Sequence, residues 1–426
     1  MRIVFVHRRG PGQFQHLAPF LAERGWTVTL VCETVAARVP GVAVVRHRVE
    51  PPARSGDRFA RHLATTEQHV RIGHRVAEAL GNLARRDGPP DLVVGHLGWG
   101  GLLFAKDVLP TTPVLGYCEY FYRAEGGDVG HDPAEPVGED DRRRLRLLNA
   151  TQLLALDAAD GGISPTHWQR SRFPAPYRRR IAVCHEGIDV ERIRPDPTAR
   201  FVLPDGRRLK PGDPVVTYAA RDLEPYRGFP QFMRALADVL RRRPRAIAVI
   251  AGGDGVSYGR PPPDGGGWRE AMLGELAAEG TPLDPDRVIF LGHVPHARLI
   301  RLFQVSAAHV YLTVPFVLSW SMLEAMAAGA LVIGSATAPV TEVIADGHNG
   351  LLAPFFDRAA LADRIVEALD GGPGPASLRA AARRTVVERY ALDRCLARQA
   401  SLIDEVLGAG RRRGRRRPPG IDEHAA

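Results

Sequence analysis

The amino-acid sequence predicts an α/β protein with two doubly wound parallel sheets in tandem. Short β-rich apolar runs alternate with helical segments along most of the 426 residues, and this alternation is typical of parallel sheets with crossover helices. The alternation also falls into two series, with a proline-rich boundary at 194–214 between them. Two such sheets in one chain predict a ligand cleft at the carboxyl edges of their strands.

The first series opens with a βαβ unit. A β-rich apolar run at 1–6 is followed by apolar residues at helical spacing over 13–24 and by a second β-rich run at 27–32. In chain order, the series then continues with helix 68–86, strand 91–95, helix 100–107, strand 113–117, helix 141–158 and strand 161–163.

The second series begins near residue 214 and repeats the alternation. Its predicted strands are 214–219, 245–251, 287–291, 308–313 and 330–334, and its predicted helices are 228–242, 268–279, 296–304, 319–328, 358–370 and 376–388. A last amphipathic helix at 392–407 has no strand of its own to cover.

These patterns divide the chain into four parts. We expect an N-terminal domain at 1–195, a C-terminal domain at 196–388 and a returning helix at 389–408. The remaining segment, 409–426, holds six arginines together with glycine and proline and has no apolar periodicity. We therefore expect it to be a disordered arginine-rich tail.

Composition excludes several classes of protein. Hydrophobic residues make up 45% and charged residues 25% of the chain, which is ordinary for a globular protein. The four cysteines have no short spacing, so the sequence predicts neither a disulfide scaffold nor a CxxC metal site. The apolar run at the start is too short for a signal peptide, and the uncharged stretch 305–323 contains His309 and Pro315. We expect a cytoplasmic protein without a membrane span.

Nearly half of the net charge of +9 lies near the C-terminus, where six arginines occur at 411–413 and 415–417. No aromatic residues alternate with them to stack on bases, so we do not expect a nucleic-acid partner. The tail is better suited to a peripheral contact with an anionic membrane surface. No cluster in the sequence predicts a bound metal.

Two features suit the binding of phosphate groups. Gly10 and Gly12 lie between the first strand and the first helix, but Gln15 takes the place of the third glycine of a dinucleotide fingerprint. Arg221 and Arg227 flank the end of a strand and the start of a helix, where two guanidinium groups are well placed to clamp a diphosphate. Because arginine is abundant in this chain, ordinary surface arginines are the alternative.

Further candidates follow other strands. Gly252, Gly253 and Asp254 form a bare loop that a ligand can approach, or simply a tight turn. Glu324 lies in a helix of small and apolar residues and needs partners there, either ribose hydroxyls or a structural ion pair with an arginine. His96 and Glu119 follow two strands of the first sheet and are candidates for catalysis, although a lone histidine is more often structural.

Together, the segments resemble the retaining, nucleotide-sugar-dependent glycosyltransferases of family 4, which have the GT-B fold of two facing Rossmann-like domains and a C-terminal crossover helix. The resemblance covers roughly residues 1–408. It is carried by the opening MRIVFVHRRGPGQFQHLAPFLAERGWTVTLV, and by ISPTHWQRSRFP, HEGIDVERIRP, RDLEPYRGF, GGDGVSYG, SWSMLEAMAAGALVIGS and TEVIADGHNGLLAPFFD.

The resemblance implies a donor site in the second domain. Arg221 and Arg227 would grip the donor diphosphate, although the family usually has lysine at the second position. Glu324 corresponds to the second glutamate of the E-x7-E motif and would bind the ribose. Phe316 stands where the first glutamate usually contacts the donor sugar, so backbone groups of Val317, Leu318, Ser319 and Trp320 would reach the sugar instead.

In the first domain, the resemblance implies that Gly12 and Gln13 face the reaction centre. Glu119 occupies a position where the family often has histidine. The catalytic candidates are therefore Arg221, Arg227, Glu119 and His96. The expected co-substrate is a nucleoside diphosphate sugar, without a further cofactor or metal, and the acceptor is a small molecule, a glycan or a lipid-linked sugar.

The resulting hypothesis is glycosyl transfer with retention at the anomeric carbon. Two alternatives remain open. One is a nucleotide-sugar epimerase of the same fold, which would convert the donor without an acceptor. The other is a catalytically silent nucleotide-sugar-binding protein, which the departures at Phe316 and Glu119 favour.

Overall fold

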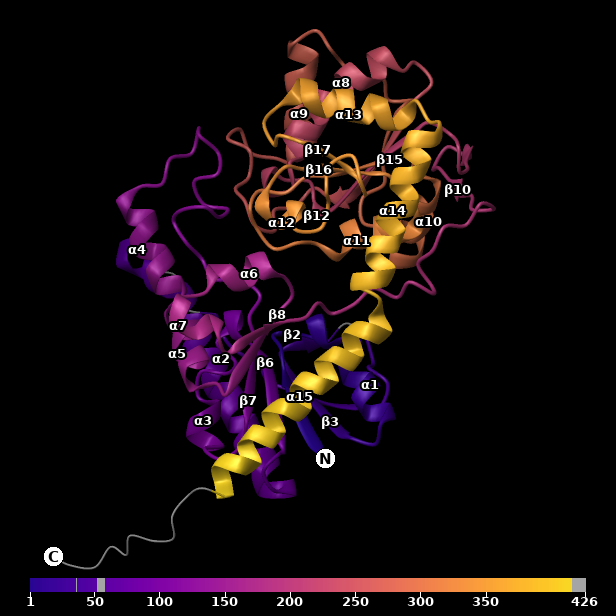
Figure 1. Ribbon diagram of the computed structural model, residues 1–426. Coiled ribbons are helices and arrows are strands. Elements are labelled where there is room, and N and C mark those ends of the chain that lie inside the picture. Colours follow the sequence, from indigo (N-terminus) through magenta and orange to yellow (C-terminus); the bar gives the residue numbers. More distant parts are fainter. Residues whose placement is uncertain (36, 52–57, 416–426) are drawn as a thin grey trace, which may run out of the picture. The chain divides into compact units, whose positions relative to one another are not determined.

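A computed structural model describes residues 1–35, 37–51 and 58–415, which form two compact units (Figure 1). The first unit takes the described residues of Met1–Ala124, Val137–Glu186 and Asp393–Ala426, and the second takes Glu125–Pro136 and Gly187–Leu392.

The sequence-based domain boundaries differ from these units in three ways. The units divide at 186/187 rather than at 195/196, because Ile188, Val190 and Ile193 are buried in the core of the second unit. The segment 125–136 belongs to the second unit, and the last helix belongs to the first.

The first unit is built on a seven-stranded parallel sheet with the strand order β5-β3-β1-β6-β7-β8-β9. In its register, Ile3 of the central strand lies opposite Val28 on one side and Leu92 on the other. The strands are β1 (Arg2–Val6), β3 (Thr27–Cys32), β5 (Val42–Arg46), β6 (Leu92–His96), β7 (Val114–Tyr117), β8 (Gly161–Ser164) and β9 (Ile181–Val183), with a separate pair β2 (Arg9–Gly10) and β4 (Thr34–Val35).

Helices cover both faces of this sheet. Alternate residues of β1 point to opposite faces, so Phe5 packs on Phe14 near α1 while Val4 shares a core with Ile72 and Val76 of α2. The helices are η1 (Gly12–Phe14), α1 (Leu17–Glu23), α2 (Arg58–Asp87), η2 (Leu97–Trp99), α3 (Ala105–Val108), α4 (Glu139–Leu148), α5 (Ala150–Ala158), α6 (His167–Arg172), α7 (Ala175–Arg178) and α15 (Leu392–Arg415).

The second unit has a six-stranded parallel sheet with the order β14-β13-β12-β15-β16-β17. Its strands are β12 (Val215–Asp222), β13 (Ile247–Gly253), β14 (Val288–Phe290), β15 (Ala308–Tyr311), β16 (Val332–Ser335) and β17 (Leu351–Ala353). A short antiparallel hairpin, β10 (Phe201–Val202) and β11 (Arg208–Leu209), precedes this sheet in the chain.

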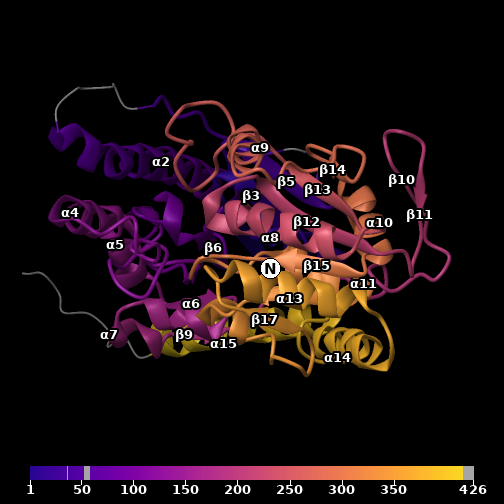
Figure 2. The ribbon, with the colours of Figure 1, turned by 90° about the horizontal axis from the view of Figure 1, so that it is seen from above.

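Both faces of the second sheet are also covered. On β12, Tyr218 stacks on Phe232 of α8, whereas Val215 shares a core with Leu302 of α10. In Figure 2, α8 and α13 lie side by side over this sheet. The helices are η3 (Pro225–Arg227), α8 (Phe229–Arg242), α9 (Trp268–Ala278), α10 (His296–Val305), α11 (Trp320–Ala328), α12 (Ala338–Thr341), α13 (Arg358–Leu369) and α14 (Pro373–Arg389). Burial on both faces explains why these strands are nearly continuous apolar runs.

The alternation of strands and helices is confirmed, but several details differ from the prediction. The helix expected at 141–158 divides at Asn149, whose side-chain amide bonds the backbone N–H and carbonyl of Tyr122. The helix expected at 100–107 is reduced to α3, because Gly100 ends η2 with a positive φ of 76°. The sequence did not predict the strands at 181–183, 201–202, 208–209 and 351–353, which have only two or three residues. It also did not predict the strand at 42–46, which lies at the edge of its sheet and has no fully buried residue.

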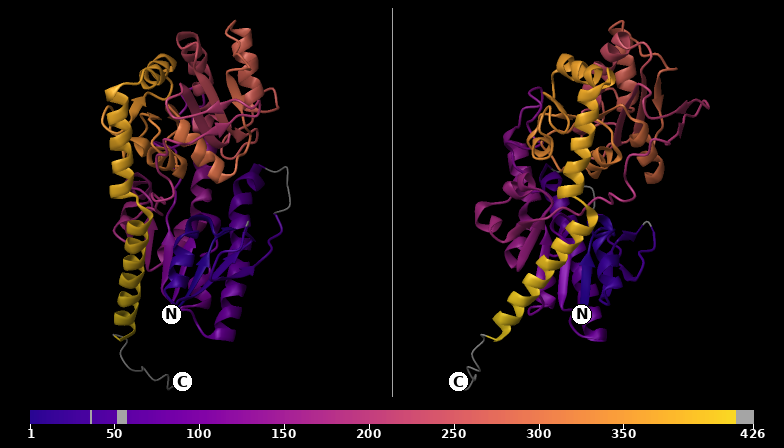
Figure 3. Two further views of the ribbon diagram at one scale, coloured as in Figure 1. Left: turned by 90° about the vertical axis from the view of Figure 1, so that its right-hand side faces the viewer. Right: turned by 45° about the vertical axis from the view of Figure 1, so that its right-hand side comes forward.

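The last helix, yellow in Figure 3, is longer than the expected span of 389–408. It runs from Leu392 to Arg415 and so includes part of the segment that we expected to be disordered. Arginine is a good helix former and no proline occurs before residue 418, so the helix can continue. The disorder expected for 416–426 concerns residues outside the described part of the chain. No helix of the described residues has the length and apolarity to cross a membrane.

Candidate active site

The first unit gathers polar side chains at the point where its strand order reverses. The chain passes from β1 to β3 on one side and then returns to place β6 on the other side of β1. Ligands of open α/β sheets bind at such a point, beyond the carboxyl ends of the strands. His7 directly follows β1, His96 ends β6 and Glu119 lies two residues after β7.

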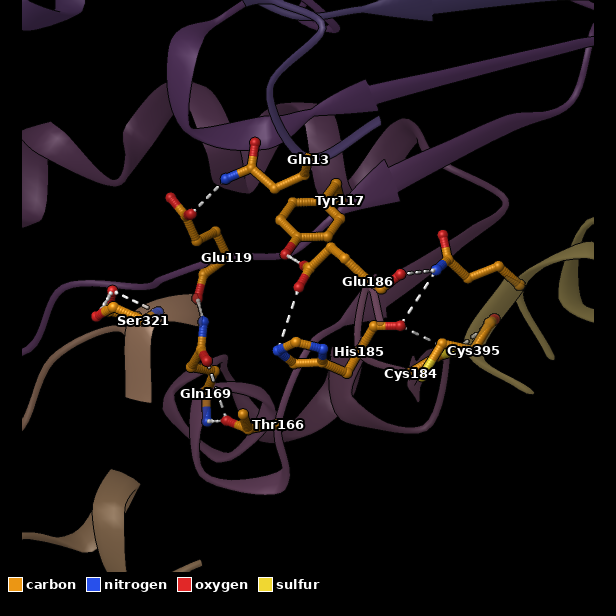
Figure 4. A network of polar contacts seen from close by, with 12 residues as sticks. Gln13, Tyr117, Glu119, Thr166, Gln169, Cys184, His185, Glu186, Ser321 and Cys395 are labelled. Atoms are coloured by element: carbon orange, nitrogen blue, oxygen red, sulfur yellow. Dashed lines mark hydrogen bonds and ion pairs between the residues drawn. The ribbon is translucent and has the colours of Figure 1, made fainter. Parts of the chain in front are cut away.

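These side chains form one hydrogen-bonded network around the Glu119 carboxylate, part of which is drawn in Figure 4. The Gln13 side-chain amide donates to Oε1 of Glu119 at 2.6 Å, and Nε2 of His96 lies 3.1 Å from Oε2. The Gln13 carbonyl in turn lies 2.8 Å from Nε2 of His7.

The backbone fixes the proton positions in both histidines. The N–H of Gly98 donates to Nδ1 of His96 at 3.0 Å, and the N–H of Arg9 donates to Nδ1 of His7 at 3.0 Å. Because each Nδ1 accepts a hydrogen bond, each Nε2 carries the proton. Every bond of the network therefore points toward Glu119.

The surroundings keep Glu119 ionised. Burial alone would raise the pKa of Glu119, but the electrostatic attraction and the hydrogen bond of His96, together with His7 and Gln13, lower the pKa on balance. Burial, with a smaller contribution from the nearby His96, lowers the pKa of His7 to about 4, so His7 is neutral near pH 7. The Glu119 side chain is 27% exposed and can still accept a hydrogen bond from a hydroxyl group.

The network requires a residue without a side chain at position 12. Its φ of 53° is left-handed, and a Cβ atom at this position would overlap the His7 ring. Glycine therefore lets the turn before α1 close onto His7 and place Gln13 between His7 and Glu119. The sequence singled out Gly12 and Gln13, and the structure brings Gln13 to Glu119.

A second, fully buried polar cluster follows β7 and β9. The Tyr117 hydroxyl donates to Glu186, and Nε2 of His185 lies 3.4 Å from the same carboxylate (Figure 4). Burial lowers the pKa of His185 to about 4. The Gln399 amide of α15 donates to the carbonyls of His185 and Glu186. His185 and Glu186 lie in the segment HEGID, which the sequence marked only as part of a family motif.

The second unit repeats the strand reversal between β12 and β15. Arg221 lies near the end of β12, and Arg227 ends η3 directly before α8. Gly228 makes this geometry possible, because its φ of 65° is left-handed and an added Cβ would come within 2.5 Å of Leu312. Both arginines line one pocket together with Tyr258, and Arg221 is exposed there.

Arg227 is held by neutral groups. Its Nη1 donates to the Tyr311 hydroxyl at 3.3 Å, to Oγ1 of Thr313 at 2.9 Å and to the carbonyl of Val317 at 3.0 Å. Within the described residues, neither Arg227 nor Arg221 forms an ion pair with a carboxylate. A half-buried guanidinium without a counter-ion favours an anionic ligand.

The glycine loop is organised by two acidic side chains. Oε2 of Glu224 accepts hydrogen bonds from the backbone N–H groups of Ser257, Tyr258 and Gly259 at 3.3, 3.1 and 2.9 Å. Asp222 accepts a hydrogen bond from the Ser257 hydroxyl. The glycines are needed here for packing, since a Cβ on Gly253 would overlap His293 and one on Gly252 would come within 2.8 Å of Leu223.

The structure places Asp254 away from this pocket. Asp254 is exposed and lies 3.5 Å from Arg269. The pocket lining near the end of β12 instead includes Asp222 and Glu224, two acidic residues of RDLEPYRG that the sequence did not mark as candidates.

The segment before α11 is already bonded to the protein. The Val317 carbonyl accepts from Arg227, and the Ser319 N–H donates to the Tyr311 hydroxyl at 2.8 Å. Leu318 and Trp320 pack against the apolar core. Phe316 is buried within an aromatic group formed with Tyr226 and Tyr258. No pattern in the sequence indicated that Tyr311 and Thr313 would hold Arg227.

Glu324 of α11 is paired with a histidine. Nε2 of His296, the first residue of α10, lies 2.7 Å from Oε1 of Glu324. This hydrogen bond raises the pKa of His296, and burial offsets only part of the effect. The sequence left open a structural ion pair between Glu324 and an arginine. The partner is instead His296, which α10 brings to this carboxylate. The two side chains are 11% and 49% exposed, so the pair borders solvent.

Comparisons with known proteins agree with this architecture. A family model described as "Glycosyl transferase family 4 group" matches residues 24–193, and one described as "Glycosyl transferases group 1" matches residues 204–385. A D-inositol 3-phosphate glycosyltransferase from Streptomyces coelicolor is 27% identical over 341 residues, which cover 75% of this chain and 69% of the relative.

Solved structures are similar over nearly the whole chain. A sucrose-phosphate synthase from Thermosynechococcus elongatus has a TM-score of 0.71 at 18% identity and covers 96% of this chain and 100% of its own. The Anabaena protein HepE, solved in complex with UDP-glucose, has a TM-score of 0.66 at 15% identity and covers 95% of this chain and 100% of its own. These similarities confirm the predicted fold class.

Proposed function

Because this chain belongs to the family 4 glycosyltransferases of the GT-B fold, we propose that it transfers a sugar from a nucleoside diphosphate sugar to an acceptor hydroxyl, with retention at the anomeric carbon. The single observation that carries this proposal is the Arg227 guanidinium. It is half-buried beside the exposed Arg221 and is held only by neutral groups. A diphosphate supplies the negative charge that such a pair of arginines favours.

The two arginines suit the chemistry of the leaving group. As the bond between the anomeric carbon and the phosphate oxygen breaks, negative charge develops on the diphosphate. Preorganised guanidinium groups stabilise that charge in the transition state. This role supports transfer without a metal, and turnover that is unchanged after treatment with EDTA would agree with it.

Glu119 suits the acceptor. As an ionised, partly exposed carboxylate fixed by Gln13 and His96, it can accept a hydrogen bond from the attacking hydroxyl and orient it. In front-face retention, the acceptor oxygen bonds to the anomeric carbon on the side that the diphosphate leaves. The hydroxyl proton then passes to an oxygen of the leaving diphosphate, so the step needs no further base.

The relatives suggest the first substrates to test. The Anabaena structure contains UDP-glucose, and the curated relative is named for D-inositol 3-phosphate. We therefore choose UDP-glucose as the first donor and D-inositol 3-phosphate as the first acceptor. Glycans and lipid-linked sugars are the next acceptor classes to be tried.

The experiment begins with a thermal-shift panel of UDP, GDP, ADP and their sugars against the wild-type chain and Arg227→Ala. A ligand at a hundred times its Kd stabilises the folded state by about 2.7 kcal/mol. We expect one nucleoside to raise the Tm of the wild type and to lose most of this effect in the variant. Transfer is then followed with the selected donor, and NMR of the product reports the anomeric configuration.

Other outcomes separate the alternatives. An epimerised sugar nucleotide formed without acceptor would indicate an isomerase. Binding without hydrolysis or transfer, for every acceptor class, would indicate a silent binding protein. A product of inverted anomeric configuration would contradict the proposed retention but not the proposed glycosyl transfer.

A further inference from the structure

A tyrosine ring lies beside the two arginines of the pocket at the end of β12. Tyr258, in the loop that follows β13, lines this pocket together with Arg221 and Arg227. The centre of its ring lies 5.7 Å from the Arg227 guanidinium carbon and 5.1 Å from the centre of the Phe316 ring. Tyr258 is 39% exposed, and its hydroxyl has no hydrogen-bond partner among the residues that the structure describes. This O–H group is therefore available to an anion that binds the arginines.

One carboxylate oxygen holds the loop that carries this ring. Oε2 of Glu224 accepts hydrogen bonds from the three consecutive backbone N–H groups of residues 257–259. Glu224 is only 1% exposed, so water has little access to these bonds. If the carboxylate were removed, the three N–H groups would lose their partner in a place where water replaces it poorly. The position of the Tyr258 backbone therefore depends on Glu224.

Glu224 also belongs to the turn that carries Arg227. It directly precedes η3, and its backbone carbonyl accepts hydrogen bonds from the N–H groups of Arg227 at 3.2 Å and of Phe229 at 3.3 Å. Within the described part of the chain, its carboxylate forms no ion pair with Arg221 or Arg227. The loop N–H groups satisfy its negative charge instead, so both guanidinium groups stay available to a ligand. One residue thus fixes the loop of Tyr258 to the turn of Arg227.

Resting on the proposed function, we propose that the Tyr258 hydroxyl donates a hydrogen bond to an oxygen of the donor diphosphate, and that Glu224 is the positioning residue that holds Tyr258 there. A neutral O–H donor strengthens the binding of a diphosphate, because hydrogen bonds to charged acceptors are stronger than those between neutral groups. Glu224 acts through Tyr258 and does not touch the ligand, since two anions in contact repel each other.

The test measures ligand affinity by titration calorimetry. UDP and UDP-glucose are measured first, with GDP and GDP-mannose and ADP and ADP-glucose as further pairs. The proteins are the wild type, Tyr258→Phe, Glu224→Ala, Glu224→Gln and the double variant Glu224→Ala/Tyr258→Phe. Tyr226→Phe is the matched control for the hydroxyl, because Tyr226 stacks on Tyr258 but donates to Asp128 and does not line the pocket. Glu270→Ala is the control for the acid, because Glu270 is exposed on α9.

We expect Tyr258→Phe to weaken the diphosphate and its sugar nucleotide equally, by about tenfold, because the lost hydrogen bond is to the group that both ligands share. Glu224→Ala should cause a similar loss. Glu224→Gln should recover most of the affinity, because its amide oxygen can still accept the loop N–H groups. The double variant should bind no more weakly than Glu224→Ala alone, since both changes remove the same contact. Both controls should stay within twofold of the wild type.

Several results would overturn the proposal. No loss in Tyr258→Phe, or a loss confined to the sugar nucleotide, would separate the hydroxyl from the diphosphate. An equal loss in Tyr226→Phe would assign the effect to the packing of the rings. Losses that add in the double variant would show that Glu224 does not act through Tyr258. If Glu224→Ala is unfolded by circular dichroism, Glu224→Asp takes its place, because the shorter side chain draws the carboxylate away from the loop.

Arg227→Ala separates a failure of this inference from a failure of the proposed function. If Arg227→Ala leaves the diphosphate affinity unchanged, or if the wild type binds none of the pairs, the proposed function fails and this inference fails with it. If Arg227→Ala weakens the diphosphate but Tyr258→Phe does not, the inference alone fails.

Discussion

The two units place their polar residues at the same topological position but use it in opposite ways. In the first unit, the strand reversal is filled by a closed network in which Gln13 and His96 bond the Glu119 carboxylate. In the second, the same position holds Arg221 and Arg227 without a carboxylate partner among the described residues. The first unit thus provides a carboxylate that is fixed by hydrogen bonds from its own side chains. The second provides guanidinium groups that favour an anionic ligand. The same fold therefore supports two kinds of chemistry, set by side chains at the strand ends.

We expect the largest effect on turnover from a substitution that breaks the Glu119 network of the first unit. Glu119→Gln keeps the size of the side chain but removes the charge, so the acceptor hydroxyl loses its anchor. We expect turnover to fall about 100-fold, which is the loss that a misplacement of about 1 Å at the reacting group can cause. Diphosphate affinity, measured by calorimetry, should remain within twofold. Glu119→Asp is the matched control for charge, and normal turnover in Glu119→Gln would remove this residue from the reaction.

The next effect concerns the second unit's clamp. Arg227→Ala removes a charge-assisted contact worth about 1.5–3 kcal/mol, so diphosphate affinity should fall about 10- to 100-fold. Arg221→Ala should have a smaller effect, because Arg221 is exposed and screened by water. Arg227→Lys should fall between them, since a lysine keeps the charge but has a single nitrogen, which cannot both hold Thr313 and Val317 as Nη1 does and leave further N–H groups for the ligand. Equal losses for Arg221→Ala and Arg227→Ala would contradict the difference in burial.

The two units should also differ in their response to acid. Burial lowers the pKa of three histidines in the first unit to about 4, namely His7, His69 and His185, and lowers the pKa of one in the second, His309, to about 3. An unfolded histidine binds its proton near pH 6.5, whereas these native ones do so only near their lowered pKa. Stability is therefore complete above pH 6.5 and is lost as the pH falls toward 4.

Within this window, each such histidine lowers the free energy of unfolding by up to about 1.4 kcal/mol for each unit that the pH falls. We expect the first unit to open at a higher pH than the second. Pulse-labelling hydrogen exchange, at one labelling pH after incubation between pH 7 and 4, reports each unit through its own peptides. Simultaneous opening of both units would indicate that they unfold as one body.

The smallest effect tests the pair of Glu324 and His296. If Glu324 holds the donor ribose, Glu324→Gln should weaken nucleotide binding up to tenfold with little change in Tm. His296→Gln should have a smaller effect, because His296 only orients the carboxylate and its side chain is 49% exposed. A variant Glu324→Gln that melts much lower but binds nucleotide normally would assign the pair to structure.

The same pair predicts a pH dependence opposite to that of the buried histidines. The bond to Glu324 raises the pKa of His296 above 6.5. Its stabilisation is therefore fully present below the unfolded pKa and is lost as the pH rises through the raised pKa. The difference in Tm between the wild type and His296→Gln should be larger at pH 6 than at pH 8.5.

The sequence by itself determined the class of fold and singled out two arginines, Arg221 and Arg227, that the structure brings to one pocket. Strands that are buried on both faces must be apolar runs, and helices that cover them must repeat at helical spacing, so both leave local signals. Arg221 and Arg227 could be found because they lie beside a strand end and a helix start in one short segment.

Only the tertiary structure decided which partner each polar side chain has. Glu119 meets Gln13 across 106 residues, Glu324 meets His296 across 28, and Tyr226 meets Asp128 across 98. No local period encodes such pairs, because they depend on the order of the strands and on the path of the loops between them. The segment 125–136 is the clearest case, since its sequence position suggests the first unit while its contacts with Tyr226 and with the Phe355 ring place it in the second.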